Sequence, residues 1–189
     1  MNTAVFTYPN GKITRDKKHE FIVMKDESGE INYPDRFSKT VANNGTIQVN
    51  QGEPAFVDFK FKVGNDVGDA RTSKIVDKID HNTFDVSAET LDAIKSSISG
   101  LYDWNYPIDG DTMDVSIDGD GNLVIAPNDQ FPKDSSWDSA QAPYNRGYEF
   151  TITIPTHPIF GKQTLQIKNS ATYSGSDITS EYGSTAEAS

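Results

Sequence analysis

The fold is decided by one alternating stretch, Ala55-Phe56-Val57-Asp58-Phe59-Lys60-Phe61-Lys62-Val63. Residues two apart in a β-strand lie on the same face, so the valines and phenylalanines from Val57 to Val63 share one face. Asp58 and the two lysines lie on the other face. An apolar face opposite a charged face is typical of a strand that covers a hydrophobic core on one side only. The stretch therefore predicts an antiparallel sheet with one buried face.

The same alternation recurs on both sides of this strand, and Gly, Pro, Asn or Asp separates the segments. The six further segments are residues 36–41, 73–80, 113–117, 122–125, 148–155 and 164–173. Short strands at such spacing are typical of two sheets packed face to face. The chain is therefore predicted to fold as an all-β sandwich.

One segment, residues 87–100, departs from this pattern. Ser87 is a good N-cap residue, and Gly100 is a residue that commonly follows a helix. Between them Leu91, Ile94 and Ile98 recur at the spacing of one helix face. The segment predicts one short helix inserted into the sandwich.

The chain divides into three parts. Residues 36–174 hold all seven strands and are predicted to form one domain. Residues 1–35 are predicted to be an N-terminal extension or the end of a preceding module, with strands at 4–8 and 20–24 in a hairpin-like arrangement. Residues 175–189 contain few apolar residues and are predicted to be a polar tail or linker.

Composition excludes several classes of function. The 189 residues include 17 basic and 28 acidic ones, for a net charge of -11, and no basic run is long enough to follow a phosphate backbone. Nucleic acid and anionic membranes are therefore not expected partners, and no apolar run predicts membrane insertion. The chain has no cysteine, which excludes disulfides and thiolate chemistry. Its three histidines, His19, His81 and His157, are far apart, and no phosphate or dinucleotide motif occurs, so no cofactor is expected.

Three polar residues occupy inward positions of the predicted strands. Lys39 lies between the inward residues Phe37 and Val41, Asp77 shares a face with two isoleucines, and Asn169 follows Leu165 and Ile167 on an inward face. Burial lowers the pKa of a lysine and raises that of an aspartic acid. A neutral Lys39 amine would attack the Asn169 carboxamide while a protonated Asp77 polarises its carbonyl, and ammonia would leave. A purely structural interpretation stands beside this, because inward lysines snorkel at strand edges and buried asparagines cap bulges.

The order of these residues resembles a known family, the isopeptide-forming immunoglobulin-like domains of Gram-positive surface adhesins and pilins, of the collagen-adhesin type or the antigen I/II C-terminal type. The resemblance runs from about residue 37 to 173. It is carried by Phe37-Ser-Lys39-Thr-Val41, Asn50-Gln-Gly52-Glu53, Ile75-Val-Asp77-Lys-Ile79 and Lys168-Asn169-Ser-Ala171-Thr-Tyr173.

The resemblance implies an immunoglobulin-like sandwich in which Lys39 and Asn169 form the crosslink and Asp77 is the catalytic proton shuttle. The proline that usually follows the aspartate motif is absent, so Asp80 is kept as the alternative aspartate. A wall-sorting signal is also absent, so the chain is predicted to be part of a longer protein.

The function expected is a stalk or adhesion domain of a cell-wall-anchored protein on the bacterial surface. Its expected partners are neighbouring domains of the same protein and a host protein or glycan. The crosslink would be a single self-modification, so the chain is not predicted to be an enzyme, and a hydrolase is a distant third interpretation. The alternative is a carbohydrate- or protein-binding adhesin head without a crosslink. Its candidate feature is the aromatic group at Tyr102, Trp104 and Tyr106, which is otherwise explained as a lid over one end of the sandwich.

An incomplete calcium motif lies at residues 118–122. Asp118, Asp120 and Asn122 have the spacing of a calcium loop, but Leu123 and Asp129 stand where an EF-hand needs Gly and Glu. The apolar alternation on both sides predicts a hairpin turn there, and no metal is expected. The long polar segment 127–145, which contains Trp137 and Tyr144, is predicted to be a loop.

Overall fold

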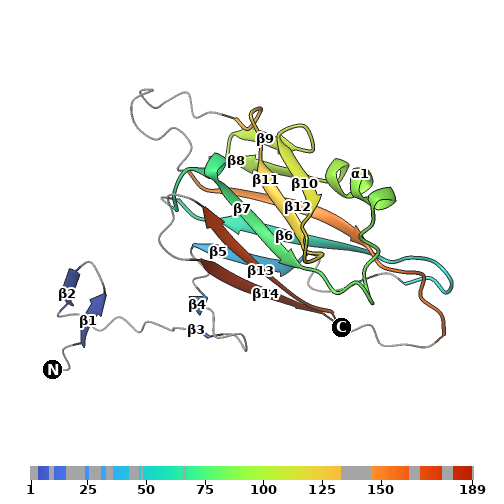
Figure 1. Cartoon of the computed structure of the whole chain (residues 1–189), viewed down its shortest axis with the longest axis horizontal. Helices are drawn as coiled ribbons and strands as arrows, with labels where there is room; N and C mark the ends of the chain where they lie inside the picture. The colour runs from blue at the N-terminus through green and yellow to red at the C-terminus, as the bar shows by residue number, and fades with distance from the viewer. Residues whose placement is uncertain are drawn as a thin grey trace.

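The computed structural model shows a sandwich of two five-stranded antiparallel sheets (Figure 1). The parts of the chain that it describes are residues 4–8, 11–15, 24–25, 31–32, 36–42, 47, 49–65, 67–132, 146–161, 167–175 and 181–188. The immunoglobulin-like all-β class with one short helix is confirmed.

The first sheet has the strand order β5-β6-β12-β8-β9. Its strands are β5 (Phe37–Val41), β6 (Phe56–Val63), β12 (Tyr148–Pro155), β8 (Ser99–Tyr102) and β9 (Tyr106–Asp109). The second sheet has the order β10-β11-β7-β13-β14. Its strands are β10 (Met113–Ile117), β11 (Leu123–Pro127), β7 (Ser73–Lys78), β13 (Ile167–Gly175) and β14 (Tyr182–Ala188). A 3-10 turn, η2 (Ala70–Thr72), precedes β7.

The core lies between the two sheets and follows the alternation of the sequence. In β6 the inward residues from Val57 to Val63 are buried, and in β12 every second residue from Tyr148 is buried. The rings of Phe61 and Phe150, which face each other across β6 and β12, stack with centroids 5.2 Å apart. All seven strands expected from alternation are present, because each has one apolar face to bury.

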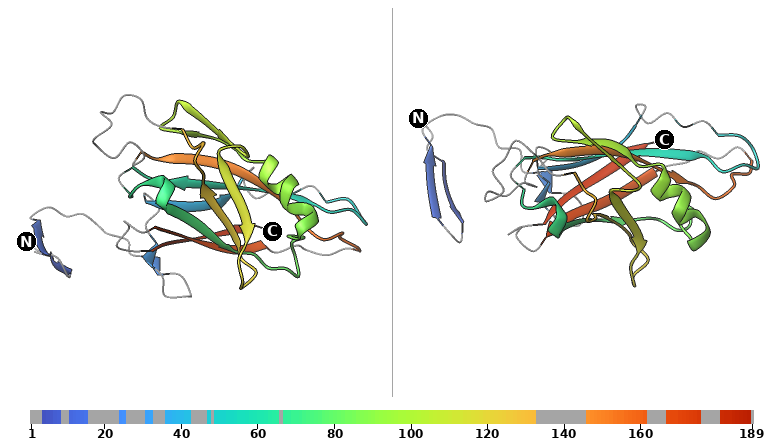
Figure 2. Two further views of the ribbon diagram at one scale, coloured as in Figure 1. Left: turned by 45° about the horizontal axis from the view of Figure 1, so that its top comes forward. Right: turned by 90° about the horizontal axis from the view of Figure 1, so that it is seen from above.

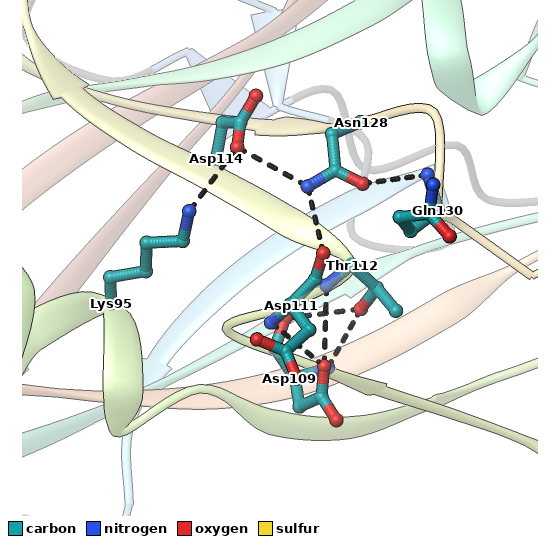
Figure 3. A network of polar contacts seen from close by, with 7 residues as sticks. All are labelled: Lys95, Asp109, Asp111, Thr112, Asp114, Asn128 and Gln130. Carbon is teal, nitrogen blue, oxygen red and sulfur yellow. Dashed lines mark hydrogen bonds and ion pairs between the residues drawn. The ribbon is translucent and has the colours of Figure 1, made fainter.

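Helix α1 (Ala88–Ser96) begins after the expected N-cap Ser87 and lies against β10 and β12. Near its C-terminal end Lys95 contacts Asp114 of β10, and further polar contacts link β10, the β9–β10 turn and the end of β11 (Figure 3). Lys95 pairs with Asp114 at 3.3 Å, and Asn128 donates to Asp114 at 3.2 Å and to the Asp111 carbonyl at 2.9 Å. The Lys95–Asp114 pair is exposed and contributes little stability, and the helix lies along one side of the sandwich, which Figure 2 shows from two further directions.

The C-terminal segment differs from the sequence prediction. Residues 175–189 were expected to be a polar tail, but Tyr182–Ala188 forms strand β14, which pairs along its whole length with β13. Its fully buried inward residues, Ser184 and Ala186, are small, and Tyr182 on the same face is partly buried against the core. Small side chains give a weak hydrophobic signal, which is why alternation did not reveal this strand.

Two further details differ near the N-terminus and in the middle of the chain. β1 (Ala4–Tyr8) pairs with β2 (Gly11–Arg15), so the partner strand comes directly after the turn and not at residues 20–24, of which 20–23 lie outside the described residues. β3 (Met24–Lys25) pairs with β4 (Ile31–Asn32). The helix ends at Ser96, and residues 99–100, which were expected to end it, begin strand β8, which forms a hairpin with β9.

Candidate functional site

Lys39 and Asp77 meet in the middle of the sandwich, each from a different sheet. Lys39 is on β5 and Asp77 is on β7. The Lys39 Nζ atom donates to both Asp77 carboxylate oxygens at 2.7 Å. Both side chains are completely buried. A buried ion pair of this kind is costly to form unless its geometry is good, and replacing it by apolar residues is often neutral or stabilising. Stability alone therefore does not explain its presence.

Asn169 lies beside this pair, on the strand next to Asp77. In the β7–β13 ladder Asp77 is opposite Ala171, so Asn169 is the diagonal neighbour of Asp77 on the same inward face. Its amide is near enough to act on the pKa of the Asp77 carboxyl. Among the described residues, neither amide atom of Asn169 has a hydrogen-bond partner of ordinary length, although Asn169 is only 1% exposed. An unpartnered buried amide is rare and calls for a reason.

Two phenylalanines of β6 form the apolar floor under the lysine. The Lys39 Nζ atom lies 4.1 Å from the centroid of the Phe59 ring and 5.3 Å from that of Phe61. Both rings are fully buried. They exclude water from the amine, and the cation–π contact offsets only part of the cost of removing a charge from water. The sequence placed both rings inward but did not show that they lie under Lys39.

Burial moves both ionisable groups toward their neutral forms. Desolvation lowers the pKa of Lys39 from 10.5 to about 8, although the nearby Asp77 charge and hydrogen bond act in the opposite direction. Desolvation likewise raises the pKa of Asp77 above 3.8, against the opposing influence of Lys39 and Asn169. With the two pKa values moved toward each other, transfer of the proton from amine to carboxylate costs much less than in water. The site therefore gives access to a neutral amine beside a carboxylic acid and an unpartnered carboxamide.

The alternative aspartate, Asp80, is not part of this site. It is exposed, and it caps a turn by accepting hydrogen bonds from the Asn82 backbone at 3.0 Å and the Thr83 hydroxyl at 2.7 Å. These bonds lower the pKa of Asp80, so that it remains a carboxylate at neutral pH. The structure brings together Lys39, Asp77 and Asn169 and leaves Asp80 at the surface.

The calcium candidates form the turn between β10 and β11. One Asp118 oxygen accepts hydrogen bonds from the backbone of Asp120 and Asn122, each at 2.9 Å, and the other accepts from the Asn122 side chain at 3.0 Å. Both oxygens of the Asp118 carboxylate are therefore used in hydrogen bonds within the turn. Among the described parts of the chain, no group of three or more His, Asp or Glu side chains is arranged to hold a metal ion.

The histidines serve local structure where they are described. The His81 ring contacts the Gly121 carbonyl at 2.6 Å, and the His157 ring contacts the His81 carbonyl at 2.9 Å. Both are exposed, and His19 lies outside the described residues. Of the predicted loop 127–145, residues 133–145, with Trp137 and Tyr144, also lie outside them.

The aromatic group divides between the core and the surface. Tyr102 is fully buried, with its ring centroid 5.0 Å from that of Phe131. Trp104 is 58% exposed at the turn of the β8–β9 hairpin, where the Lys62 Nζ atom lies 5.8 Å from its ring centroid. Tyr102 therefore helps to close the end of the core, whereas Trp104 faces solvent.

Among solved structures, the chain is similar to the N-terminal domain of the Streptococcus gordonii adhesin Sgo0707, with a TM-score of 0.53 and 12% sequence identity. The chain shares its fold with this adhesin domain. The match covers 84% of this chain and 33% of the Sgo0707 structure, so the chain spans about a third of its length. At this identity the likeness concerns the adhesin fold alone.

Two looser matches are to the collagen-binding subdomain ACE19 of the Enterococcus faecalis surface protein ACE and to the C-terminal domain of the Streptococcus pyogenes antigen I/II-family protein AspA. The first has a TM-score of 0.43 and 11% identity and covers 83% of this chain and 97% of the other. The second has a TM-score of 0.45 and 12% identity and covers 80% of this chain and 46% of the other. No family model matches the sequence, and no curated protein matches it either. In the described part of the chain, no helix is long and apolar enough to cross a membrane.

Proposed function

We propose that the chain is a stalk or adhesion domain of a bacterial cell-wall-anchored surface protein, stabilised by an autocatalytic isopeptide bond between Lys39 and Asn169. The observation that carries this proposal is the buried Lys39–Asp77 pair next to an asparagine amide without a partner. The adhesin fold supports the surface role. Neighbouring domains of the same protein are the expected partners, and the expected location is extracellular.

The reaction follows from the proton shared by the pair. Transfer of one proton from Lys39 to Asp77 gives a neutral amine, which attacks the Cγ atom of Asn169 while the carboxylic acid donates a hydrogen bond to the carbonyl. The new bond joins Lys39 Nζ to Asn169 Cγ, and the bond from Cγ to Nδ2 breaks. Asp77 passes a proton to the departing nitrogen, which leaves as ammonia, and recovers one from the attacking amine. No outside reactant is consumed, and the reaction occurs once in each molecule.

The position of the three residues favours a structural product over turnover. All three are at most 1% exposed, so a diffusing substrate has no route to them. An enzyme or a ligand-binding head places such groups in a cleft or at a loop rim. A bond formed here joins the two sheets, which suits a domain that carries load.

Intact-protein mass spectrometry tests the crosslink. The purified chain is expected to be lighter than its sequence mass by one ammonia, and Lys39→Ala and Asn169→Ala are each expected to restore the full mass. Asp77→Ala is expected to block or slow the loss. Ser38→Ala, a change in the same strand at a half-buried residue outside the site, serves as the control and should still lose ammonia. A folded wild-type chain with its full mass would contradict the proposal.

One observation favours a second candidate, an adhesin head that binds a glycan. Trp104 presents a largely exposed ring at the β8–β9 turn, with Lys62 beside it. Aromatic faces with a polar neighbour are suited to stacking on sugar rings. A glycan array would show saturable binding that Trp104→Ala abolishes, and a crosslinked chain that binds no glycan would leave only the stalk role.

A further inference from the structure

Strand β14 touches both halves of the site although it contributes none of the three reacting groups. It pairs with β13 in a register that sets Ala186 opposite Asn169 and Ser184 opposite Ala171. On its other side it lies next to β5, the edge strand of the other sheet (Figure 1). Among the described strands it is the one that borders both the strand of Lys39 and the strand of Asn169.

A single hydroxyl makes the connection to Lys39. The Lys39 backbone N–H donates to Ser184 Oγ at 2.8 Å, and the same hydroxyl donates to the Lys39 carbonyl at 3.4 Å. In the part of the chain that the structure describes, β5 pairs with β6 alone, and Lys39 occupies a non-hydrogen-bonded position of that ladder, since the bonded pairs Arg36–Gly64 and Ala42–Asp58 lie three residues to either side. Its backbone N–H and C=O therefore have no partner within the ladder. Ser184 is 6% exposed, and buried backbone groups without a partner are costly. The hydroxyl thus satisfies the donor and the acceptor of the reactive lysine together.

These contacts close a ring around the site. Asp77 is opposite Ala171 in the β7–β13 ladder, and Ala171 is opposite Ser184 in the β13–β14 ladder. Ser184 binds the backbone of Lys39, and the Lys39 side chain returns to Asp77. The lysine is therefore held at both ends, with Asn169 beside the ring. Because the lysine is held at its backbone and at its side chain, its amine is confined to a narrow range of positions. Holding a reacting group in the right orientation accelerates the reaction.

We propose that β14 sets the two ends of the crosslink in place before the bond forms, with Ser184 as a positioning residue for Lys39. This inference rests on the proposed function. The reacting atoms are those of Lys39, Asp77 and Asn169, and Ser184 acts through the backbone of the lysine. Once the bond has formed, the bond itself holds Lys39 next to Asn169. Strand β14 therefore affects the rate at which the crosslink forms and not its stability afterwards.

The test follows ammonia loss over time, by intact mass, in full-length chains made by cell-free translation. Ser184→Ala is expected to slow the loss by about tenfold, because it opens the ring at one point. Ser184→Thr, which keeps the hydroxyl, is expected to restore most of the rate. Thr185→Ala removes a hydroxyl from the same strand at its neighbouring, less buried position and is expected to react like the wild type. The pH limits of the reaction should stay unchanged in all three, since the hydroxyl contacts no titrating group.

The outcomes separate this inference from the proposed function. Wild-type and Ser184→Ala chains that react at the same rate would overturn the positioning role alone. Equal slowing by Thr185→Ala, or a Ser184→Thr variant as slow as Ser184→Ala, would assign the effect to strand packing and overturn the role of the hydroxyl. A wild-type chain that never loses ammonia would overturn both proposals.

A second measurement does not depend on the reaction. In the unreactive Asn169→Ala background, hydrogen exchange is expected to show a protected Lys39 amide that becomes selectively faster when Ser184→Ala is added. Unchanged protection of that amide would contradict the contact on which the inference is built.

Discussion

Lys39 and Asp77 share one proton between two groups that burial has moved toward neutrality. The pKa of Lys39 is lowered to about 8 and that of Asp77 is raised, so the reactive arrangement contains the same number of protons as the ion pair. The site therefore needs no change in total charge to become reactive, only a shift of the proton along a 2.7 Å hydrogen bond. This property confines the reaction to a range of pH.

We predict a bell-shaped pH dependence of the crosslinking rate. Above about pH 8 Lys39 loses its proton to solvent, which leaves the amine neutral but Asp77 without a proton to donate, so the rate falls. Below the raised pKa of Asp77 the pair holds an extra proton, the amine stays charged, and the rate falls again. Intact mass against time at a series of pH values measures this. A rate that keeps rising beyond pH 9 would contradict the role of the acid.

The sequence predicted which individual residues face inward, but it did not predict which residues they contact. Strand alternation placed Lys39, Asp77 and Asn169 in the core, because side-chain direction is a local property of a strand. Ser184 was missed because its partner, Lys39, is 145 residues away in the sequence. Such a contact depends on which strand edges meet, and that is decided by the whole sandwich.

The pairing of β8 with β12 depends on a glycine. Gly100 is opposite Phe150, and a methyl group on it would meet the Glu149 carbonyl and the Phe150 backbone closer than any real contact. We predict that Gly100→Ala lowers the free energy of unfolding by about 1–3 kcal/mol. Gly119→Ala is the matched control, because an added methyl there meets no atom within 4 Å. Denaturant melts should separate the two, and equal stabilities would be evidence against the close approach of β8 and β12.

The β8–β9 turn is strained at two residues. Asp103 and Trp104 both have positive φ, at 46° and 61°, where glycine and asparagine are preferred. We predict that Trp104→Gly raises the free energy of unfolding by about 1 kcal/mol relative to Trp104→Ala, since both remove the ring and only glycine relieves the backbone. Thermal denaturation of the two variants measures the difference. If Ala proves as stable as Gly, the turn does not hold that strain.

Elements with alternating large residues were predictable, and elements with small or few apolar residues were not. β6 and β12 could be predicted because large apolar residues, including phenylalanines and isoleucines, recur at every second position. β8, with the sequence Ser-Gly-Leu-Tyr, and β14, whose fully buried inward side chains are small, carry no such signal. Both strands form because a neighbouring strand offers an edge, which is a tertiary effect that overrides local propensity.

For the whole molecule, the crosslink encloses residues 39–169, which contain most of both sheets. We predict that the crosslinked wild type is more stable than Asn169→Ala by on the order of 4–5 kcal/mol, by analogy with a disulfide that closes a loop of similar length. Equilibrium denaturation of the two proteins measures this difference. Asn105→Ala, which changes an exposed asparagine of the β8–β9 turn, is the control and should stay within about 0.5 kcal/mol of the wild type. Equal stability of the wild type and Asn169→Ala would contradict the prediction that the bond stabilises the fold by lowering the entropy of the unfolded chain.

Strand β14 lies beyond Asn169, and in a crosslinked molecule that position gives it a mechanical role. A pull on the C-terminus acts first on Ala188, which is opposite Ile167, so the β13–β14 ladder opens one pair at a time from that end. The 19 residues after Asn169 up to Ala188 then extend by at most roughly 65 Å before the load reaches the covalent bond. The domain would thus give up β14 and the part of β13 after Asn169, which also pairs with β7, and then resist with the strands between Lys39 and Asn169 in place. In a force-extension record we expect lengthening from the segments outside the crosslink and none from residues 39–169, whereas Asn169→Ala should unravel completely.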